Sequence, residues 1–129
     1  MSSLSEQMEA NALEAMKLTR KHFVVELDFS ESSMEQLEGL ANDVEFIMPG
    51  GTSEENIKLL TRVWGSYIGE VIRRNLDGQW VKSTEGDDSP ASIEVGGSAV
   101  NPFGQIRKRL QGESASNLWT FYQDVRDSS

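Results

Sequence analysis

The strongest constraint on the fold of this chain is a long amphipathic pattern near its middle. Between Ser53 and Asp77, large apolar side chains recur every three or four positions, which is the period of an α-helix. They are Ile57, Leu60, Trp64, Ile68 and Val71, and the stripe is widened by Val63, Tyr67 and Ile72. Thr52 or Ser53 is a suitable cap, and Asp77-Gly78 ends the pattern. We therefore predict a long helix that is the structural centre of the protein.

Two glycines, Gly65 and Gly69, lie four residues apart inside this predicted helix. In a helix, each glycine costs about 1 kcal/mol relative to alanine. They do not stand between a strand and a helix, so they fit neither a phosphate-binding loop nor a dinucleotide-binding motif. We infer that they serve close packing against a sheet or a neighbouring helix.

Two further helices are predicted before the central one. Residues 4–21 carry small or flexible apolar side chains at helical spacing. A second helix follows Ser32, which has the capping-box spacing to Glu35, and it ends before Pro49. Its apolar face consists of Leu37, Leu40, Ala41 and Val44.

Residues 23–29 lie between those two helices and alternate in polarity. Phe23, Val25, Leu27 and Phe29 share one face, and this alternation predicts a strand with one side buried. Three shorter strands are predicted after the central helix, at residues 79–83, 91–95 and 98–100. The intervening Gly96-Gly97 is suited to the tight turn of a hairpin.

Two more helices complete the predicted order, α-β-α-α-β-β-β-α-α. One begins at Asn101-Pro102 and ends at Gly112, and the last spans about residues 116–126. Because most of the strands are consecutive, we expect an α+β fold with an antiparallel sheet of about four strands packed against several helices, rather than a doubly wound fold. The 129 residues fit a single domain, residues 1–129.

The composition argues against several classes of site. Without cysteine, the chain has no disulfide, thiolate metal ligand or cysteine nucleophile. The N-terminus shows no signal-peptide pattern, and no apolar run approaches the roughly 18 residues of a membrane helix. The single histidine, His22, has no recognisable catalytic partner, and Asp87-Asp88 lacks a calcium-loop pattern. We expect a cytoplasmic, non-enzymatic protein without metal or cofactor.

The charge is distributed unevenly along the chain. The net charge is −9; residues 1–56 hold 12 acidic and 3 basic side chains, whereas residues 57–129 hold 9 of each. An acidic surface repels nucleic acid and anionic membranes and attracts basic proteins. The candidate partner-binding residues are Glu26 and Asp28, on the polar face of residues 23–29, and Glu35 and Glu38, in the second helix. The alternative is a dispersed, solvated surface that binds nothing.

Four residues are candidates for a ligand site between the central helix and the sheet: Tyr67, Glu70, Arg73 and Arg107. Glu70 would line a cleft there, and the arginines would supply an anion site if the fold brings the two helix ends together. The alternative for Glu70 is a surface ion pair with Arg73 or Arg74, worth a few tenths of a kcal/mol. The alternative for Arg107 is a favourable position in the last turns of its helix, where cations complement the dipole.

Three segments together resemble a small, functionally uncharacterised family of bacterial α+β domains. They are LDFSESSMEQLEGL (27–40), WGSYIGEVIRRNLDGQW (64–80) and NPFGQIRKRLQGESASNLWTFY (101–122). The resemblance covers most of residues 23–125 and implies a compact bacterial domain. It implies no activity, cofactor or catalytic residue.

The function that we expect from the sequence is therefore a non-enzymatic interaction or regulatory protein. An acidic, immunity-type inhibitor of a basic partner is one concrete form of it. The alternative is a small-ligand-binding domain with a pocket between the central helix and the sheet.

Overall fold

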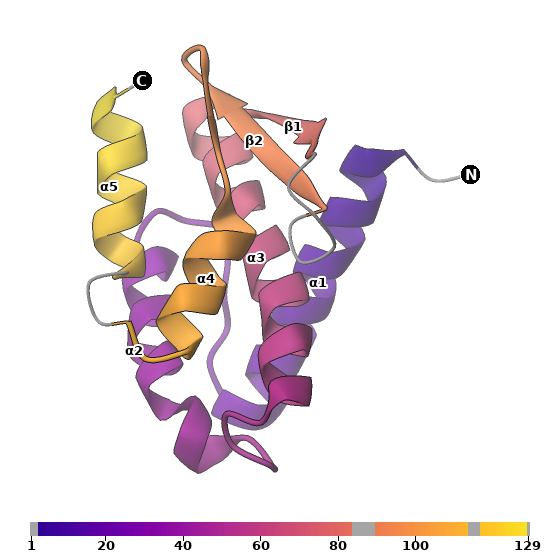
Figure 1. Ribbon diagram of the computed structural model, residues 1–129, viewed down its shortest axis with the longest axis vertical. Helices are drawn as coiled ribbons and strands as arrows, with labels where there is room; N and C mark the ends of the chain where they lie inside the picture. The colour runs from indigo at the N-terminus through magenta and orange to yellow at the C-terminus, as the bar shows by residue number, and fades with distance from the viewer. Residues whose placement is uncertain (1–2, 84–89, 114–116, 129) are drawn as a thin grey trace.

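The computed structural model describes residues 3–83, 90–113 and 117–128. In these residues, five helices accompany one antiparallel sheet with the strand order β1-β2-β3 (Figure 1). The helices are α1 (Leu4–Phe23), α2 (Ser33–Ile47), α3 (Glu54–Leu76), α4 (Pro102–Leu110) and α5 (Leu118–Ser128). The strands are β1 (Gln79–Lys82), β2 (Ala91–Val95) and β3 (Ser98–Val100). The α+β class is confirmed, but the described residues contain three strands where about four were predicted.

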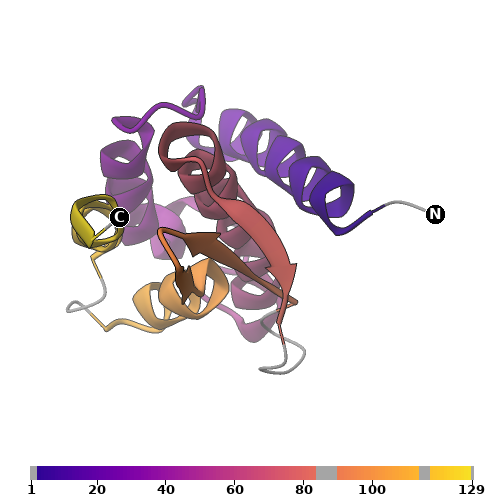
Figure 2. The same ribbon diagram turned by 90° about the horizontal axis from the view of Figure 1, so that it is seen from above.

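Helix α3 is the centre of this arrangement, as the sequence predicted. Ser53 caps its start, since the Ser53 side chain accepts a hydrogen bond from the backbone N–H of Asn56. Every residue from Val63 to Ile72 is buried, so this part of the helix is covered on all sides. Figure 2 shows α1 and α4 on different sides of α3 and the sheet lying across it.

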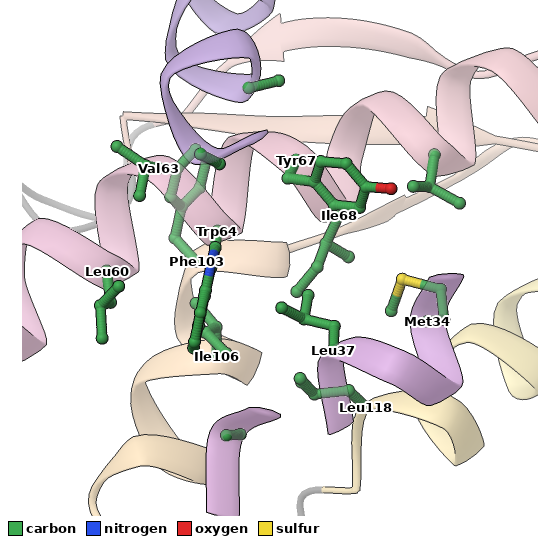
Figure 3. Close-up of a cluster of buried hydrophobic side chains, with 14 of the residues drawn as sticks. Met34, Leu37, Leu60, Val63, Trp64, Tyr67, Ile68, Phe103, Ile106 and Leu118 are labelled. Atoms are coloured by element: carbon green, nitrogen blue, oxygen red, sulfur yellow. The ribbon is translucent and has the colours of Figure 1, made fainter. Parts of the chain in front are cut away.

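The hydrophobic core forms where α3 meets the helices around it. In Figure 3, side chains of α3 such as Trp64 and Ile68 meet others that come from α2, α4 and α5. The fully buried partners from those helices include Leu37, Ile106 and Leu118. Removing this apolar surface from water is the main stabilising contribution to such a fold.

The predicted strand at residues 23–29 does not form. Instead, α1 continues through Phe23 and ends at Val24, which has a positive φ of 57°. The predicted alternation of burial is nevertheless present, because Phe23 and Leu27 are buried while Val24 is 85% exposed. No strand pairs with the segment in the described residues. Instead, the backbone N–H of Phe29 donates a hydrogen bond to the Tyr67 hydroxyl at 2.9 Å. The side-chain amide of Asn75 donates another to the Phe29 carbonyl at 2.8 Å.

The start of α2 also differs from the prediction. Ser32 has a helical backbone and makes no capping hydrogen bond, so the predicted capping box with Glu35 is wrong. Ser30 and Ser33 bond each other instead: the Ser33 hydroxyl donates to the Ser30 carbonyl at 2.6 Å, and the Ser30 hydroxyl oxygen accepts from the Ser33 N–H at 3.2 Å. A capping box does exist in α1, between Ser3 and Glu6.

The hairpin and the last two helices agree with the prediction. Gly96 and Gly97 have φ values of 57° and 84°, as a two-residue type I′ turn requires. Asn101 caps α4, and its side chain accepts from the Gly104 N–H at 3.0 Å. Residue 116, the predicted start of the last helix, lies outside the described residues. None of the described helices combines the length and the apolar character needed to cross a membrane.

Candidate functional site

Glu70 is a fully buried carboxylate between α3 and β1, not the surface ion pair that we considered. Its side chain has no solvent exposure. Arg73 donates two hydrogen bonds to it, at 2.7 and 2.9 Å, and the indole N–H of Trp80 donates a third at 2.8 Å. Arg74 approaches the same carboxylate at 3.4 Å. Each carboxylate oxygen therefore accepts at least one charge-assisted bond.

Burial by itself would raise the pKa of Glu70, because desolvation disfavours the charged form. The hydrogen bonds from Arg73 and Trp80, together with the charges of Arg73 and Arg74, outweigh that effect. They hold the pKa of Glu70 below its ordinary value. The carboxylate is thus charged and fully engaged, which suits a structural link between α3 and β1 better than a proton-transfer group.

The two glycines of α3 allow large aromatic rings to reach the helix, which confirms the inferred packing role. A Cβ atom at Gly69 would lie 2.0 Å from the Trp80 ring, and one at Gly65 would lie 2.4 Å from the Phe103 ring. Trp80 belongs to β1 and Phe103 to α4. At Gly69, the space between α3 and the sheet is therefore filled by the indole.

The four ligand-site candidates do not converge. The Tyr67 hydroxyl donates to Ser33 at 2.7 Å and lies on the side of α3 that meets the 24–32 segment. Arg107 pairs with Glu54 at 2.6 Å. Since Glu54 is the first residue of α3 and Glu70 lies four turns later, the two ends are about 24 Å apart along the helix. Of the four, Glu70 and Arg73 are brought into contact, and Arg107 lies elsewhere.

The four partner-site candidates do not form one patch either, because three of them are bonded to other residues of the chain. Glu26 pairs with Arg20 at 3.2 Å, and Asp28 accepts from the N–H and the hydroxyl of Ser30. Glu38 is largely buried, at 17% exposure of its side chain. It accepts from the Arg109 guanidinium at 2.9 Å and from the Leu118 N–H at 2.9 Å, and thereby ties α2 to α4 and α5. Only Glu35 is exposed without a bonding partner in the described residues.

Glu35 belongs to a continuous exposed stripe on α2, which we call the α2 outer face: Glu35, Gly39, Asp43 and Phe46. Their spacing of four, four and three residues places them on one side of the helix. Phe46 is 86% exposed, and a Cβ added at Gly39 would meet no atom of the described residues within 4 Å. Asp43, like Glu35, has no hydrogen bond or ion pair within the described part of the chain. This face is the candidate functional site.

Our sequence reasoning named Glu35 and missed Phe46. A signal was present, because Phe46 lies outside the spacing of Leu37, Leu40 and Val44 and therefore cannot share their buried face. His22 lies in the last turn of α1, where cations complement the helix dipole. No three His, Asp or Glu side chains of the described residues are grouped as metal ligands would be.

Comparisons of this chain with known protein families, with curated proteins and with solved structures found no match. The resemblance to a bacterial domain family therefore stays a prediction.

Proposed function

We propose that this protein is a non-enzymatic interaction protein that binds a basic protein partner through the α2 outer face. The observation that carries the proposal is Phe46, a large aromatic side chain that is 86% exposed on the same stripe as Glu35 and Asp43, which the described part of the chain leaves unpaired. An exposed aromatic with an acidic surround has the composition of a docking site whose centre is apolar and whose rim is charged.

Gly39 supports the same proposal. An exposed glycine inside a helix costs about 1 kcal/mol relative to alanine. Gly65 and Gly69 offset that cost by admitting aromatic rings, whereas nothing in the described chain approaches Gly39. A partner that packs its own backbone or an aromatic ring against this position would account for it.

The charge of the helix indicates the chemistry of the partner. Every ionisable side chain in α2 is acidic, and two of them, Glu35 and Asp43, have no hydrogen bond or ion pair with any described residue. Together with the net charge of −9, this favours attraction of a basic surface and rapid, salt-sensitive association. An immunity-type inhibitor that neutralises a basic toxin is one concrete form of the proposal, and the bacterial resemblance is compatible with it.

The test is affinity capture from an extract of the organism that makes the protein, at low and at high salt. The parent protein should capture a basic protein that Phe46→Ser and the double variant Glu35→Lys, Asp43→Lys do not capture. Release by salt is expected because the Debye length falls from about 10 Å at 0.1 M to about 3 Å at 1 M.

The matched control is Glu94→Lys, which reverses an exposed carboxylate of β2 without touching α2. It should capture the same protein as the parent. Capture that is equal for all variants, or an absence of any specifically captured protein, would contradict the proposal. Circular dichroism of each variant establishes that loss of capture is not loss of folding.

A second candidate function, small-ligand binding, is favoured by one observation. A groove of about 640 Å³ is lined by residues of α1 and α3, by Pro90 and by Phe103 of α4, and its lining includes the buried Met8, Thr61 and Phe103. The Thr61 hydroxyl oxygen is buried there without a hydrogen-bond partner. Lys58 and Arg62 also line the groove. Arg62 is paired with Glu14 at 3.0 Å, so Lys58 would supply the charge for a small anion with a hydrogen-bonding group, which is the fitting ligand class.

Thermal melting with a panel of small carboxylates and phosphates tests this second candidate. A compound that raises the midpoint of the parent should do so less for Thr61→Val, which keeps the shape of the side chain and removes its hydroxyl. Equal shifts for both proteins, or no shift for any compound, would argue against the groove.

A further inference from the structure

A second surface is shaped for a different kind of partner. A groove of about 290 Å³ lies between strand β3 and helix α5, which run beside each other at one edge of the molecule (Figure 1). Its apolar lining comes from Val95 and Val100 of the sheet and from Phe121 and Val125 of α5. The one charged side chain that lines it is Asp124.

Strand β3 is an edge of the sheet. In the described residues it pairs only with β2, in the register Val95 with Ser98, Glu94 with Ala99 and Ile93 with Val100. Residues that flank a two-residue turn exchange both backbone hydrogen bonds, and the bonded pairs then alternate along the strands. Ser98 and Val100 therefore bond β2, and the N–H and C=O of Ala99 point away from it.

No described group bonds the N–H or C=O of Ala99. Such an edge is a template for another extended chain, because the added strand supplies the missing main-chain partners. A strand placed beside β3 would also extend the sheet over α5. Phe121 and Val125, one helical turn apart, would then contact alternate side chains of the added strand.

We propose that the β3–α5 groove binds an extended peptide segment of a partner protein by adding it as a fourth strand. The peptide carries apolar side chains at alternate positions, which lie on Phe121 and Val125. It also carries a lysine or arginine opposite Asp124, a carboxylate with no ion pair in the described residues. The groove is independent of the α2 outer face, so either proposal stands without the other.

The experiment uses a library of random ten-residue peptides displayed on phage, selected against the full chain. The selected peptides should share alternating apolar residues and at least one lysine or arginine. Synthetic copies should shift the backbone amide NMR signals of Val100, Phe121 and Val125.

Two pairs of variants decide whether the groove and the strand edge bind these peptides. Ala99→Pro removes the outward N–H but no bond to β2, and proline is tolerated on strand edges. It should weaken binding about tenfold or more, whereas Ala99→Val, which keeps the N–H, should change it little. Asp124→Lys should also weaken binding, and Asp127→Lys, at an exposed site outside the groove, should not.

Each outcome bears on the proposal. Retained binding by Ala99→Pro, with its melting midpoint unchanged, would overturn strand addition. If Ala99→Pro fails to fold, the contrast between Asp124→Lys and Asp127→Lys decides, and equal binding by those two would overturn the proposal. A library that yields no peptide specific for this protein would overturn it as well.

Discussion

Helices α2 and α3 each carry glycine in their interior, but the surroundings of those glycines are opposite. A Cβ at Gly69 of α3 would collide with the Trp80 ring at 2.0 Å, whereas one at Gly39 of α2 would meet nothing within 4 Å. In α3 the glycine is explained by what the chain itself packs there. In α2 no contact with another described residue explains the glycine, which leaves a contact with a partner molecule as its explanation.

One aromatic and one acidic residue of each helix show the same contrast: those of α3 are buried and bonded, and those of the α2 outer face are exposed. Trp64 is fully buried and its indole N–H donates to Thr19, whereas Phe46 is 86% exposed. Glu70 accepts hydrogen bonds from three neighbouring side chains, whereas Glu35 accepts none in the described residues. In the described residues, the side chains of Trp64 and Glu70 of α3 are thus bonded within the fold, whereas that of Glu35 on the outer face of α2 is not. Matched substitutions in the two helices test this contrast.

The largest effect is expected for the aromatic pair. Trp64→Ala should lower the free energy of unfolding by about 3–5 kcal/mol, because it leaves a cavity in a filled core and unpairs the Thr19 hydroxyl. Phe46→Ala should change it by less than about 0.5 kcal/mol. Urea titration of both variants measures the difference. A loss below about 1 kcal/mol for Trp64→Ala would show that α3 is not the centre of the core.

The second effect depends on pH. Because the pKa of Glu70 is lower in the folded protein than its ordinary value of 4.5, its charge stabilises the fold above that value and the contribution is lost as the pH falls through the folded pKa. Glu70→Gln should therefore cost about 3 kcal/mol at neutral pH, and the gap to the parent should narrow in acid.

Urea titrations of parent and variant, from about pH 7 down to about pH 3, give this dependence. Glu35→Gln is the control, since a side chain without a partner should matter by less than about 0.5 kcal/mol throughout. A constant gap between the parent and Glu70→Gln would exclude a charge-dependent role for the carboxylate.

The third effect concerns Gly69. Gly69→Ala should destabilise the protein by about 2 kcal/mol, because the Trp80 ring must move and its hydrogen bond to Glu70 holds it in place. Thermal or urea unfolding measures the loss. If the variant is as stable as the parent, the ring has room to shift and the close approach is not required.

The smallest effect has the opposite sign. Gly39→Ala should stabilise the protein by up to about 1 kcal/mol, because alanine favours the helix and the added methyl group meets nothing. Such a gain would show that Gly39 is not retained for stability. A loss of stability on the same measurement would mean that α2 packs differently at this position.

The sequence by itself determined the elements whose signals are local. The stripe of α3, its cap at Thr52 or Ser53, the Gly96-Gly97 hairpin and the Asn101 cap were all predicted, because helical period, capping and turn geometry depend on residues within a few positions of one another. The packing role of Gly65 and Gly69 was also predicted, since two glycines inside a helix need a compensating contact.

Only the tertiary structure decided which neighbours those elements have. Alternation in residues 23–29 gave the buried face correctly, but a strand also needs a partner strand, and here the side chains of α3 bond that backbone instead. Glu38 became an internal link to Leu118, 80 residues away, while the side chain of Glu35, three residues earlier, is exposed and bonds no other described residue. Whether a side chain is buried or bonded depends on contacts between residues far apart in the sequence, and the local sequence pattern does not contain that information.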